Sequence, residues 1–302
     1  MGKGGTASHL ISRRAAGCLW RSASSKLAAL VNTRHDTNLN PPIKLISTDF
    51  DGTLFAEFEM PPIPARIVTL IGDLQARGAK WVINTGRDMS SLMEALARAR
   101  IGIQPDFLVL VEREIFIHDG MRYAGIPEWN EACSRDHAEL YARVRPDVQK
   151  LYDWVNARFR ATVYEDAFSP FCLIAGHNDD ADQIHAHLLD YCRGIPNLTV
   201  VRNDVYARFC HTAYNKGTAL TELALRLGIG SQEIFAAGDH LNDLPMLQTD
   251  RARWLAAPSN AVAEVKETVR RQQGFVSELS HGEGVADGLE FSLRTAGLEH
   301  LT

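Results

Sequence analysis

Two aspartates stand one residue apart at the end of an apolar run, in the stretch KLISTDFDGTLF of residues 44–55. Because side chains at positions i and i+2 of a strand point to the same side, Asp49 and Asp51 are predicted to direct two carboxylates into one small volume. Like charges that close repel each other, and burial disfavours their ionised forms further. The pair therefore needs a compensating partner, which is a metal ion, a proton in transfer, or both.

These residue types suit the hydrolysis of a phosphate monoester, which is among the slowest biological reactions in water alone. A carboxylate can attack phosphorus and form an aspartyl-phosphate, which divides the reaction into two easier steps. We assign the attack to Asp49. Asp51 would protonate the leaving oxygen and later take a proton from the attacking water. Gly52 permits a sharp turn at this point, and Thr53 is placed to orient Asp51.

Three further polar segments follow, each at a predicted strand end or helix start: NTGR at 84–87, NKG at 215–217 and GDHLNDLPML at 238–247. The hydroxyl of Thr85 and the amide of Gly86, at the start of a helix, suit the oxygens of a phosphate. Lys216 supplies a compact cation for the charge that builds up in the transition state.

Together with the two aspartates, these segments resemble the motifs of the haloacid dehalogenase superfamily of phosphohydrolases, over residues 43–292. The chain looks like the Cof-type branch (subfamily IIB), which includes sucrose-phosphate phosphatases and phosphomannomutases. An inserted segment of matching size and the closing stretches APSNAVAEVK and GEGVADGL carry this likeness. The resemblance implies a Mg²⁺-dependent phosphoric monoester hydrolase with Asp49 as its nucleophile.

The same resemblance implies a metal site. Mg²⁺ prefers hard oxygen ligands and keeps several waters, and the superfamily's pattern matches Asp49, the backbone carbonyl of Asp51, and Asp239. Asp243 lies four residues after Asp239, the spacing of one helical face. It is therefore expected to hold a water ligand or to steady the lysine of the NKG segment. Asn242 is expected to complete the phosphate-binding shell.

Substrate choice is expected to depend on the inserted segment and its closure. The chain reads VEREIF after the third predicted strand, where many Cof-type chains carry Asn-Gly-Ala. We expect Glu112 or Arg113 to face the leaving group there, and a solvent-exposed turn is the alternative. Arg87 is a further substrate-binding candidate. The polar candidates within the insertion are Glu165, Asp166, His177, Arg208 and His211.

The elements that must position these residues alternate between strand and helix. Strands are predicted at 43–50, 79–86 and 105–111, with helices at 63–78 and 88–102 between them. The alternation resumes with a helix at 215–229, strands at 233–239 and 253–259, a helix starting at 241 and two closing helices. Such alternation predicts an α/β fold with a doubly wound parallel sheet, whose ligands gather at the carboxyl ends of the strands.

The rhythm changes in the middle of the chain, where the order helix, strand, strand occurs twice. This order predicts an open-faced antiparallel sheet with helices on one side. We therefore expect a core domain of residues 43–116 and 212–302, an inserted α+β cap of residues 117–211, and a basic tail of residues 1–42.

The tail carries six Lys or Arg against one acidic residue, a balance of +5 in a 302-residue chain whose formal net charge is −5. The remainder is thus near −10, which argues against nucleic acid as a partner. The tail is expected to be disordered, or an upstream extension from a misplaced start codon, and an organellar transit peptide is the alternative.

Five scattered cysteines without a C-x-x-C pair indicate reduced thiols in a cytoplasmic protein, rather than a disulfide framework or a zinc site. No apolar run is long enough to span a membrane. The expected partner is a small phosphorylated molecule, with a sugar phosphate favoured. Two alternatives to a phosphatase are a phosphotransferase of the phosphomannomutase kind and a non-catalytic sensor of phosphorylated ligands.

Overall fold

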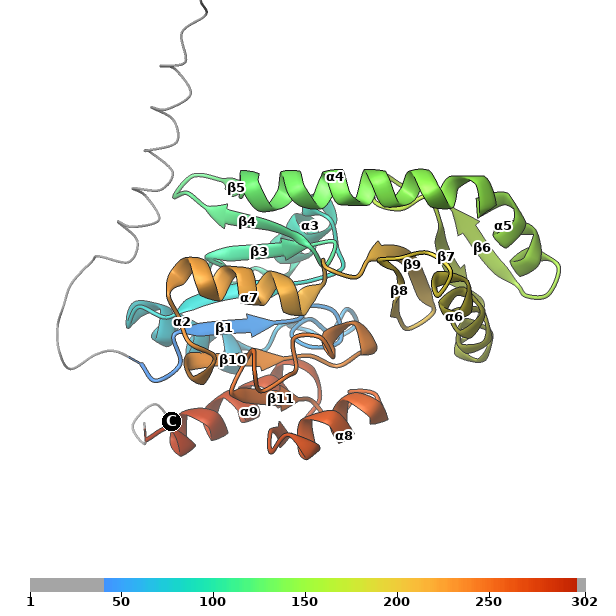
Figure 1. Ribbon diagram of the computed structural model, residues 1–302. Coiled ribbons are helices and arrows are strands. Elements are labelled where there is room, and N and C mark those ends of the chain that lie inside the picture. Colours follow the sequence, from blue (N-terminus) through green and yellow to red (C-terminus); the bar gives the residue numbers. More distant parts are fainter. Residues whose placement is uncertain (1–40, 298–302) are drawn as a thin grey trace, which may run out of the picture. The chain divides into compact units, whose positions relative to one another are not determined.

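The computed structural model describes residues 41–297 (Figure 1). The expectations for the tail of residues 1–42 therefore lie almost entirely outside the described residues. Within the described part, no helix is both long enough and apolar enough to cross a membrane.

The larger sheet has eight strands in the order β12-β11-β10-β1-β2-β3-β4-β5. Pairing is parallel from β12 to β3, whereas β4 and β5 add antiparallel strands at one edge. The strands are β1 (Leu45–Thr48), β2 (Lys80–Asn84), β3 (Phe107–Leu110), β4 (Glu114–His118), β5 (Tyr123–Gly125), β10 (Ile234–Ala237), β11 (Trp254–Ala257) and β12 (Phe275–Val276). The β1, β3 and β10 residues are all buried, as expected for a parallel sheet covered on both faces.

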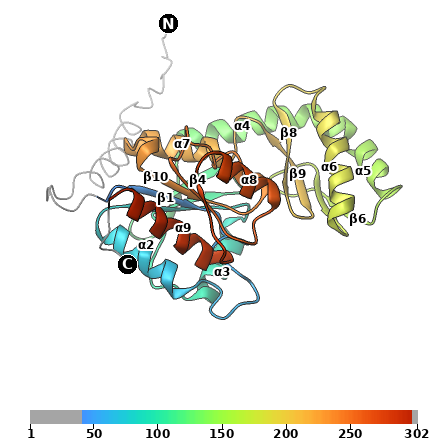
Figure 2. The ribbon, with the colours of Figure 1, turned by 90° about the horizontal axis from the view of Figure 1, so that it is seen from below.

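Helices cover both faces of this sheet (Figures 1 and 2). One face packs against α2 (Ala65–Ala76), α3 (Met89–Ala99) and α9 (His281–Thr295). The other face packs against α7 (Lys216–Leu227) and α8 (Ala263–Arg271). This arrangement confirms the predicted doubly wound α/β core.

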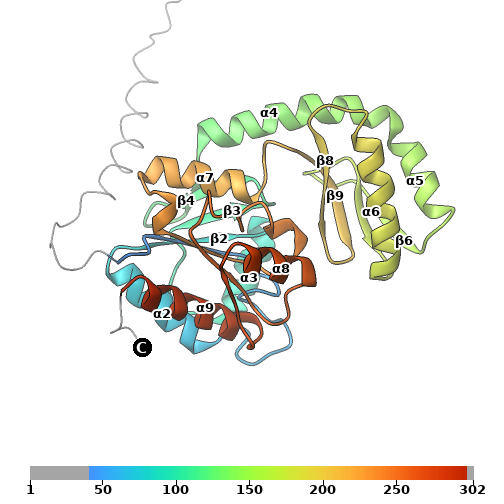
Figure 3. The same cartoon turned by 60° about the horizontal axis from the view of Figure 1, so that its bottom comes forward.

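A second, four-stranded antiparallel sheet has the order β6-β7-β9-β8 and belongs to the inserted cap (Figure 3). Its strands are β6 (Ala161–Tyr164), β7 (Cys172–Ala175), β8 (Leu198–Asn203) and β9 (Tyr206–His211). Its helical side is formed by α4 (Pro127–Val144), the 3₁₀ turn η1 (Arg145–Asp147), α5 (Val148–Asn156) and α6 (Asn178–Cys192). The predicted order of one helical stretch, two strands, one helix and two strands is confirmed.

Two helix starts determine where the site residues lie. The Asp88 side chain caps α3 by accepting a hydrogen bond from the amide of Ser91. The Asn215 side chain caps α7 by accepting from the amides of Gly217 and Thr218. Lys216 is thereby fixed as the first residue of α7.

The structure differs from the sequence-based prediction at two places. The hairpin of β4 and β5 pairs into the larger sheet, so the core sheet extends beyond residue 116 to residue 125. The predicted helix starting at residue 241 is only the 3₁₀ turn η3 (Leu241–Asp243), which is followed by irregular turns rather than by a regular helix. The reason is local, because Pro245 lacks an amide hydrogen and the Asp243 carboxylate binds backbone amides instead.

Candidate active site

A buried ion-pair cluster lies just beyond the carboxyl end of β1. Asp49 directly follows this strand and is 3% exposed, whereas Lys216 is 0% exposed. The Nζ atom of Lys216 lies 2.5 Å from Oδ1 of Asp49 and 2.6 Å from Oδ1 of Asp243. Lys216 thus bridges two carboxylates that lie far apart in the sequence. Its contact with Asp243 is one of the two roles that were predicted for that aspartate.

A hydroxyl and two amides orient the carboxylates around this lysine. Thr53 Oγ1 lies 2.7 Å from Oδ1 of Asp239 and 3.1 Å from Oδ2 of Asp49. Oδ2 of Asp243 accepts hydrogen bonds from the backbone amides of Asp239 and His240. The prediction that Thr53 orients Asp51 was wrong, because its hydroxyl joins Asp49 to Asp239.

The cluster carries an excess of negative charge. Burial and the Asp243 carboxylate raise the pKa of Asp49, and the same two causes raise the pKa of Asp239 to about 7. Burial alone would lower the pKa of Lys216, but the carboxylates of Asp243 and Asp49 raise it above its ordinary value. Three carboxylates and one ammonium leave a balance of −2 when all are ionised, which a divalent cation would neutralise.

The donor set fits Mg²⁺. One carboxylate oxygen from each of Asp49, Asp239 and Asp243 lies within 4.8 Å of the other two, and carboxylate oxygens are the ligands that Mg²⁺ prefers. Gly52 allows this approach, because it has a φ of +73° and a Cβ at this position would overlap the Asp239 carboxylate. The Asp51 side chain is not part of the cluster, so its predicted contribution is limited to the backbone carbonyl.

Asp51 points to a different partner from Asp49. Arg87 grips both carboxylate oxygens of Asp51, with Nε at 2.7 Å from Oδ2 and Nη2 at 2.6 Å from Oδ1. The Asp51 side chain is 37% exposed, in contrast to buried Asp49. The strand β1 ends at Thr48, so the same-side rule for strand residues does not extend to this pair. The Asp51 carboxylate is therefore outside the group that Asp49 forms with Asp239 and Asp243.

The residues predicted to bind phosphate come from three segments that meet beside the cluster. Thr85 follows β2 and is 1% exposed, and its Oγ1 accepts a hydrogen bond from the amide of Arg87 at 3.2 Å. Asn242 is 8% exposed, and its Nδ2 donates to Oε1 of Glu112 at 2.8 Å. That Glu112 oxygen also packs against the Gly86 backbone, 3.5 Å from where a Cβ would lie.

The three charged residues Glu112, Arg113 and Arg208 lie at the junction of core and cap and are each at most 4% exposed. Arg113 points into the cap, where its Nη2 donates to the carbonyl of Phe168 at 2.8 Å and its Nη1 lies 3.3 Å from the hydroxyl of Tyr141. Arg208, on β9, donates to Oε2 of Glu112 at 3.3 Å. The alternative of a solvent-exposed turn at Glu112 and Arg113 was wrong, because both side chains are buried.

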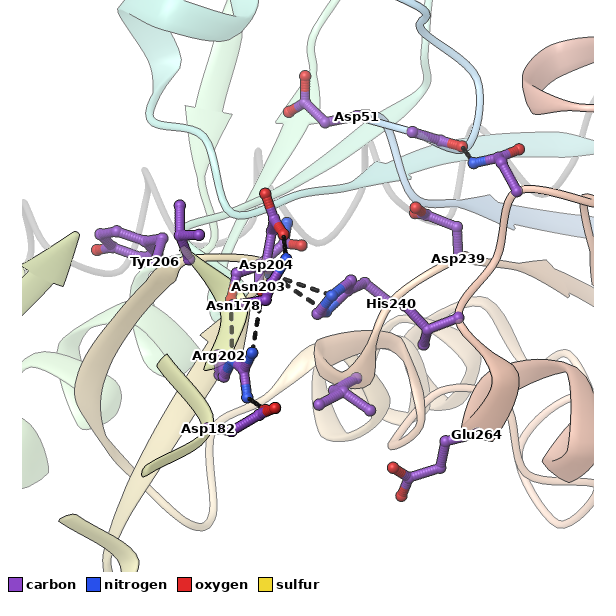
Figure 4. Close-up of a pocket in the computed structure, with 15 residues that line it drawn as sticks. Asp51, Asn178, Asp182, Arg202, Asn203, Asp204, Tyr206, Asp239, His240 and Glu264 are labelled. Atoms are coloured by element: carbon purple, nitrogen blue, oxygen red, sulfur yellow. Dashed lines mark hydrogen bonds and ion pairs between the residues drawn. The ribbon is translucent and has the colours of Figure 1, made fainter. Parts of the chain in front are cut away.

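A cleft of about 760 Å³ opens between the core loops and the cap, and Asp51 and Asp239 line its core side (Figure 4). His240 stands between the two sides, and the amide of Asp204 in the β8–β9 turn lies 3.1 Å from its Nε2. The residues of the cap that line the cleft are Asn178, Asp182, Arg202, Asn203, Asp204, Val205 and Tyr206. The cleft gives a small molecule access to Asp51 and Asp239.

A model of one protein family, the haloacid dehalogenase-like hydrolases, matches residues 135–289 of this chain. The chain belongs to this family. This result confirms the predicted family, its Cof-type branch and the fold. It also confirms the predicted enzyme class, a phosphatase of the haloacid dehalogenase (HAD) family.

This HAD-like hydrolase is similar to several phosphatases. The phosphoglycolate phosphatase of Methanosarcina acetivorans is 32% identical over 80 residues, which are 26% of this chain and only 33% of that protein. The 5-amino-6-(5-phospho-D-ribitylamino)uracil phosphatase YcsE of Bacillus subtilis is 24% identical over 250 residues, or 82% of this chain and 94% of that protein. The sucrose-phosphatase of Synechocystis sp. PCC6803, crystallised with sucrose and phosphate, superimposes with a TM-score of 0.63 at 18% identity, covering 82% and 97% of the two chains.

Sequence reasoning missed the cap residues that line the cleft of this HAD-like hydrolase. Of the five candidates within the insertion, Glu165, Asp166, His177, Arg208 and His211, none lines the cleft. Arg208 and His211 are buried, and each is at most 8% exposed. Glu165 forms an ion pair with Arg145 on the outside of the cap. The useful signal was the turn between the predicted strands at 197–204 and 205–211, which carries Asn203 and Asp204 to the cleft.

Proposed function

We propose that this protein is a Mg²⁺-dependent phosphatase that hydrolyses a sugar phosphate through an aspartyl-phosphate on Asp49. The observation that carries the proposal is the cluster in which Lys216 bridges Asp49 and Asp243 while Asp239 lies beside them. A phosphatase needs a nucleophile, a cation-binding site and a fixed positive charge in one place, and this cluster offers all three.

In the proposed reaction, an oxygen of the Asp49 carboxylate forms a bond to phosphorus while the bond from phosphorus to the leaving oxygen breaks. Asp51 gives a proton to that oxygen, and its side chain must first turn away from Arg87. In the second step Asp51 takes a proton from water, whose oxygen attacks the phosphoryl group and releases orthophosphate and the free Asp49 carboxylate.

The other predicted residues would hold the phosphoryl group in place. Thr85, Gly86 and Asn242 supply donors from two segments around the cluster, and Lys216 supplies a fixed charge from a third at no reorganisation cost. Asp49, Asp239, Asp243 and the backbone carbonyl of Asp51 would hold Mg²⁺. When bound, the metal neutralises charge between the nucleophile and the phosphate.

The substrate class rests on the cleft and on the relatives. The cap side of the cleft offers amides, carboxylates and a tyrosine, which suit the hydroxyl groups of a sugar or a sugar alcohol. YcsE, which aligns over 82% of this chain, is named for a phosphorylated ribityl compound. We propose that the inserted cap, predicted at residues 117–211 and lying after the β4–β5 hairpin, is the part that selects the substrate.

Phosphate release from a panel of phosphorylated compounds, with and without Mg²⁺, tests this proposal. The panel should contain hexose and pentose phosphates, sucrose phosphate, ribitol phosphate and phosphoglycolate. Metal-dependent release by the wild type and none by Asp49→Asn would support the proposal. An isomeric sugar phosphate without free phosphate would indicate a phosphotransferase instead, and no reaction with any compound would contradict both.

A further inference from the structure

Glu112 occupies an unusual place for an acidic residue. It follows β3 in the turn towards β4, and its φ of +68° and the φ of +45° at Val111 lie in the left-handed region that favours glycine. The side chain is 4% exposed, although it carries a carboxylate. A strained backbone and a buried acid next to a candidate active site suggest a role in that site.

The first carboxylate oxygen of Glu112 lies among the groups that we assign to phosphate. Oε1 accepts a hydrogen bond from Nδ2 of Asn242 at 2.8 Å and packs against Gly86. The negative charge of Glu112 also contributes to the raised pKa of Lys216, which places that charge close to the ammonium. The Glu112 carboxylate thus contacts Asn242 and lies beside Gly86, two of the four groups predicted to bind the phosphate, and its charge acts on a third, Lys216.

The second oxygen is held by the cap. Oε2 of Glu112 lies 3.3 Å from Nη2 of Arg208, and the same Nη2 donates to the carbonyl of Val111 at 2.7 Å. Among the described residues, Nε of Arg208 and Oδ1 of Asn242 are buried without a hydrogen-bond partner. A buried guanidinium with a free donor can accept a carboxylate that moves towards it.

We propose that Glu112 is an internal anion that competes with a substrate phosphate for the donors around Gly86 and Asn242, and that it is displaced towards Arg208 when the phosphate enters. The inference rests on the proposed function, since it requires that Gly86, Asn242 and Lys216 bind phosphate. It follows that Glu112 weakens anion binding, because two anions cannot share these donors and like charges at such a distance repel.

Binding of orthophosphate to the full-length protein with saturating Mg²⁺, measured by isothermal titration calorimetry, tests this role without any turnover. We expect Glu112→Gln to lower the Kd for orthophosphate by roughly ten- to a hundredfold, because it removes the charge but keeps the shape. Glu112→Gly should tighten binding as well, since glycine adopts the positive φ without strain. Glu114→Gln, a half-buried acid two residues along, is the matched control and should leave the Kd unchanged.

A double-mutant cycle with Arg208 tests the direction of the displacement. In the presence of Glu112, Arg208→Gln should raise the Kd for orthophosphate by about tenfold, since the displaced carboxylate loses its counter-ion. In the Glu112→Gln background, the same Arg208 substitution should have a much smaller effect. Equal effects of Arg208→Gln in both backgrounds would overturn the displacement towards Arg208.

Unchanged or weaker orthophosphate binding in both folded Glu112 variants would overturn the inference. The proposed function would still stand in that case if the wild type hydrolyses a sugar phosphate. If wild type and variants neither bind orthophosphate nor hydrolyse any compound, both the proposed function and this inference fail. Melting temperatures of all variants show which of them are folded.

Discussion

The ammonium of Lys216 lies 2.5 Å from Oδ1 of Asp49, in a position where neither group is exposed to solvent by more than 4%. The contact joins the residue after β1 to the first residue of α7, which are 167 positions apart in the chain. Because the Asn215 cap fixes the start of α7, the lysine position is set by the backbone rather than by the lysine side chain. The geometry of Asp49, the proposed nucleophile, therefore depends on this helix start.

Replacing Lys216 by Met should abolish most of the activity and destabilise the metal-free protein. We expect kcat to fall by roughly 10²- to 10³-fold, as for the loss of one preorganised charge in an active site. The buried carboxylates of Asp49 and Asp243 would lose their counter-ion, at a cost of about 3–5 kcal/mol in the free energy of unfolding. Urea unfolding and steady-state kinetics measure the two effects.

The matched control is Lys150→Met, since the Lys150 side chain is 81% exposed. It should change neither kcat nor the urea midpoint to a comparable extent. An active and fully stable Lys216→Met protein would contradict the role that we assign to the cluster.

Mg²⁺ should stabilise the wild type against heat, because it binds the folded carboxylate cluster and not the unfolded chain. At a concentration one hundred times its Kd, the expected gain is about 2.7 kcal/mol. Asp243→Asn removes one negative charge from the cluster but keeps a side-chain oxygen that can accept from the two backbone amides, so the gain at the same Mg²⁺ concentration should largely disappear. Glu264 lines the same cleft but lies outside the cluster, so the Glu264→Gln variant is the control and should keep the full gain in melting temperature.

The stability of the protein in mild acid should depend on His137, in α4. Burial, and then the nearby charge of Arg113, lower the pKa of His137 to about 3, and its side chain lies between Cys133 and Cys210. The unfolded chain, with a histidine pKa near 6.5, binds the proton first as the pH falls. Stability from this group is therefore complete above about pH 6.5 and is lost as the pH falls towards 3.

At pH 5 the expected loss from His137 is about 2 kcal/mol relative to pH 7.5. His137→Gln cannot take up this proton, so its free energy of unfolding should fall less between the two pH values. Urea unfolding of both proteins at pH 7.5 and pH 5 measures the difference. Parallel losses in the two proteins would show that His137 is not the group responsible.

The positions of Asp49, Asp239 and Lys216 could be predicted from sequence because each lies within two residues of a strand end or starts a helix. Parallel strands bring such positions to one edge of a sheet, and this placement does not depend on the orientation of the side chains. The orientation of Asp51 could not be predicted, because it depends on a bidentate contact with Arg87 across 36 residues. Contacts of this kind follow from tertiary packing and leave no periodic pattern in the sequence.

The edge of the larger sheet shows the same limit. The hairpin of β4 and β5 has only five and three residues, and its strands are less buried than β1 or β3. A short, half-buried hairpin has only a weak alternation of apolar and polar residues. The sequence therefore could not show whether this hairpin pairs with β3 or belongs to the cap. The buried ion pair of Glu112 with Arg208 and the buried hydrogen bonds of Arg113 depend on this turn and were therefore missed as well.

Arg113 should matter for anchoring the cap rather than for contacting the leaving group. Its guanidinium is 4% exposed and binds the Phe168 carbonyl and the Tyr141 hydroxyl, both in the cap. Arg113→Met should lower the free energy of unfolding by about 2–3 kcal/mol, because a buried carbonyl and hydroxyl lose a charged donor. The kcat/KM values of all substrates should fall by a similar factor, since the cap serves each of them. A stable variant with a raised KM for one leaving group alone would instead support a direct contact between Arg113 and the substrate.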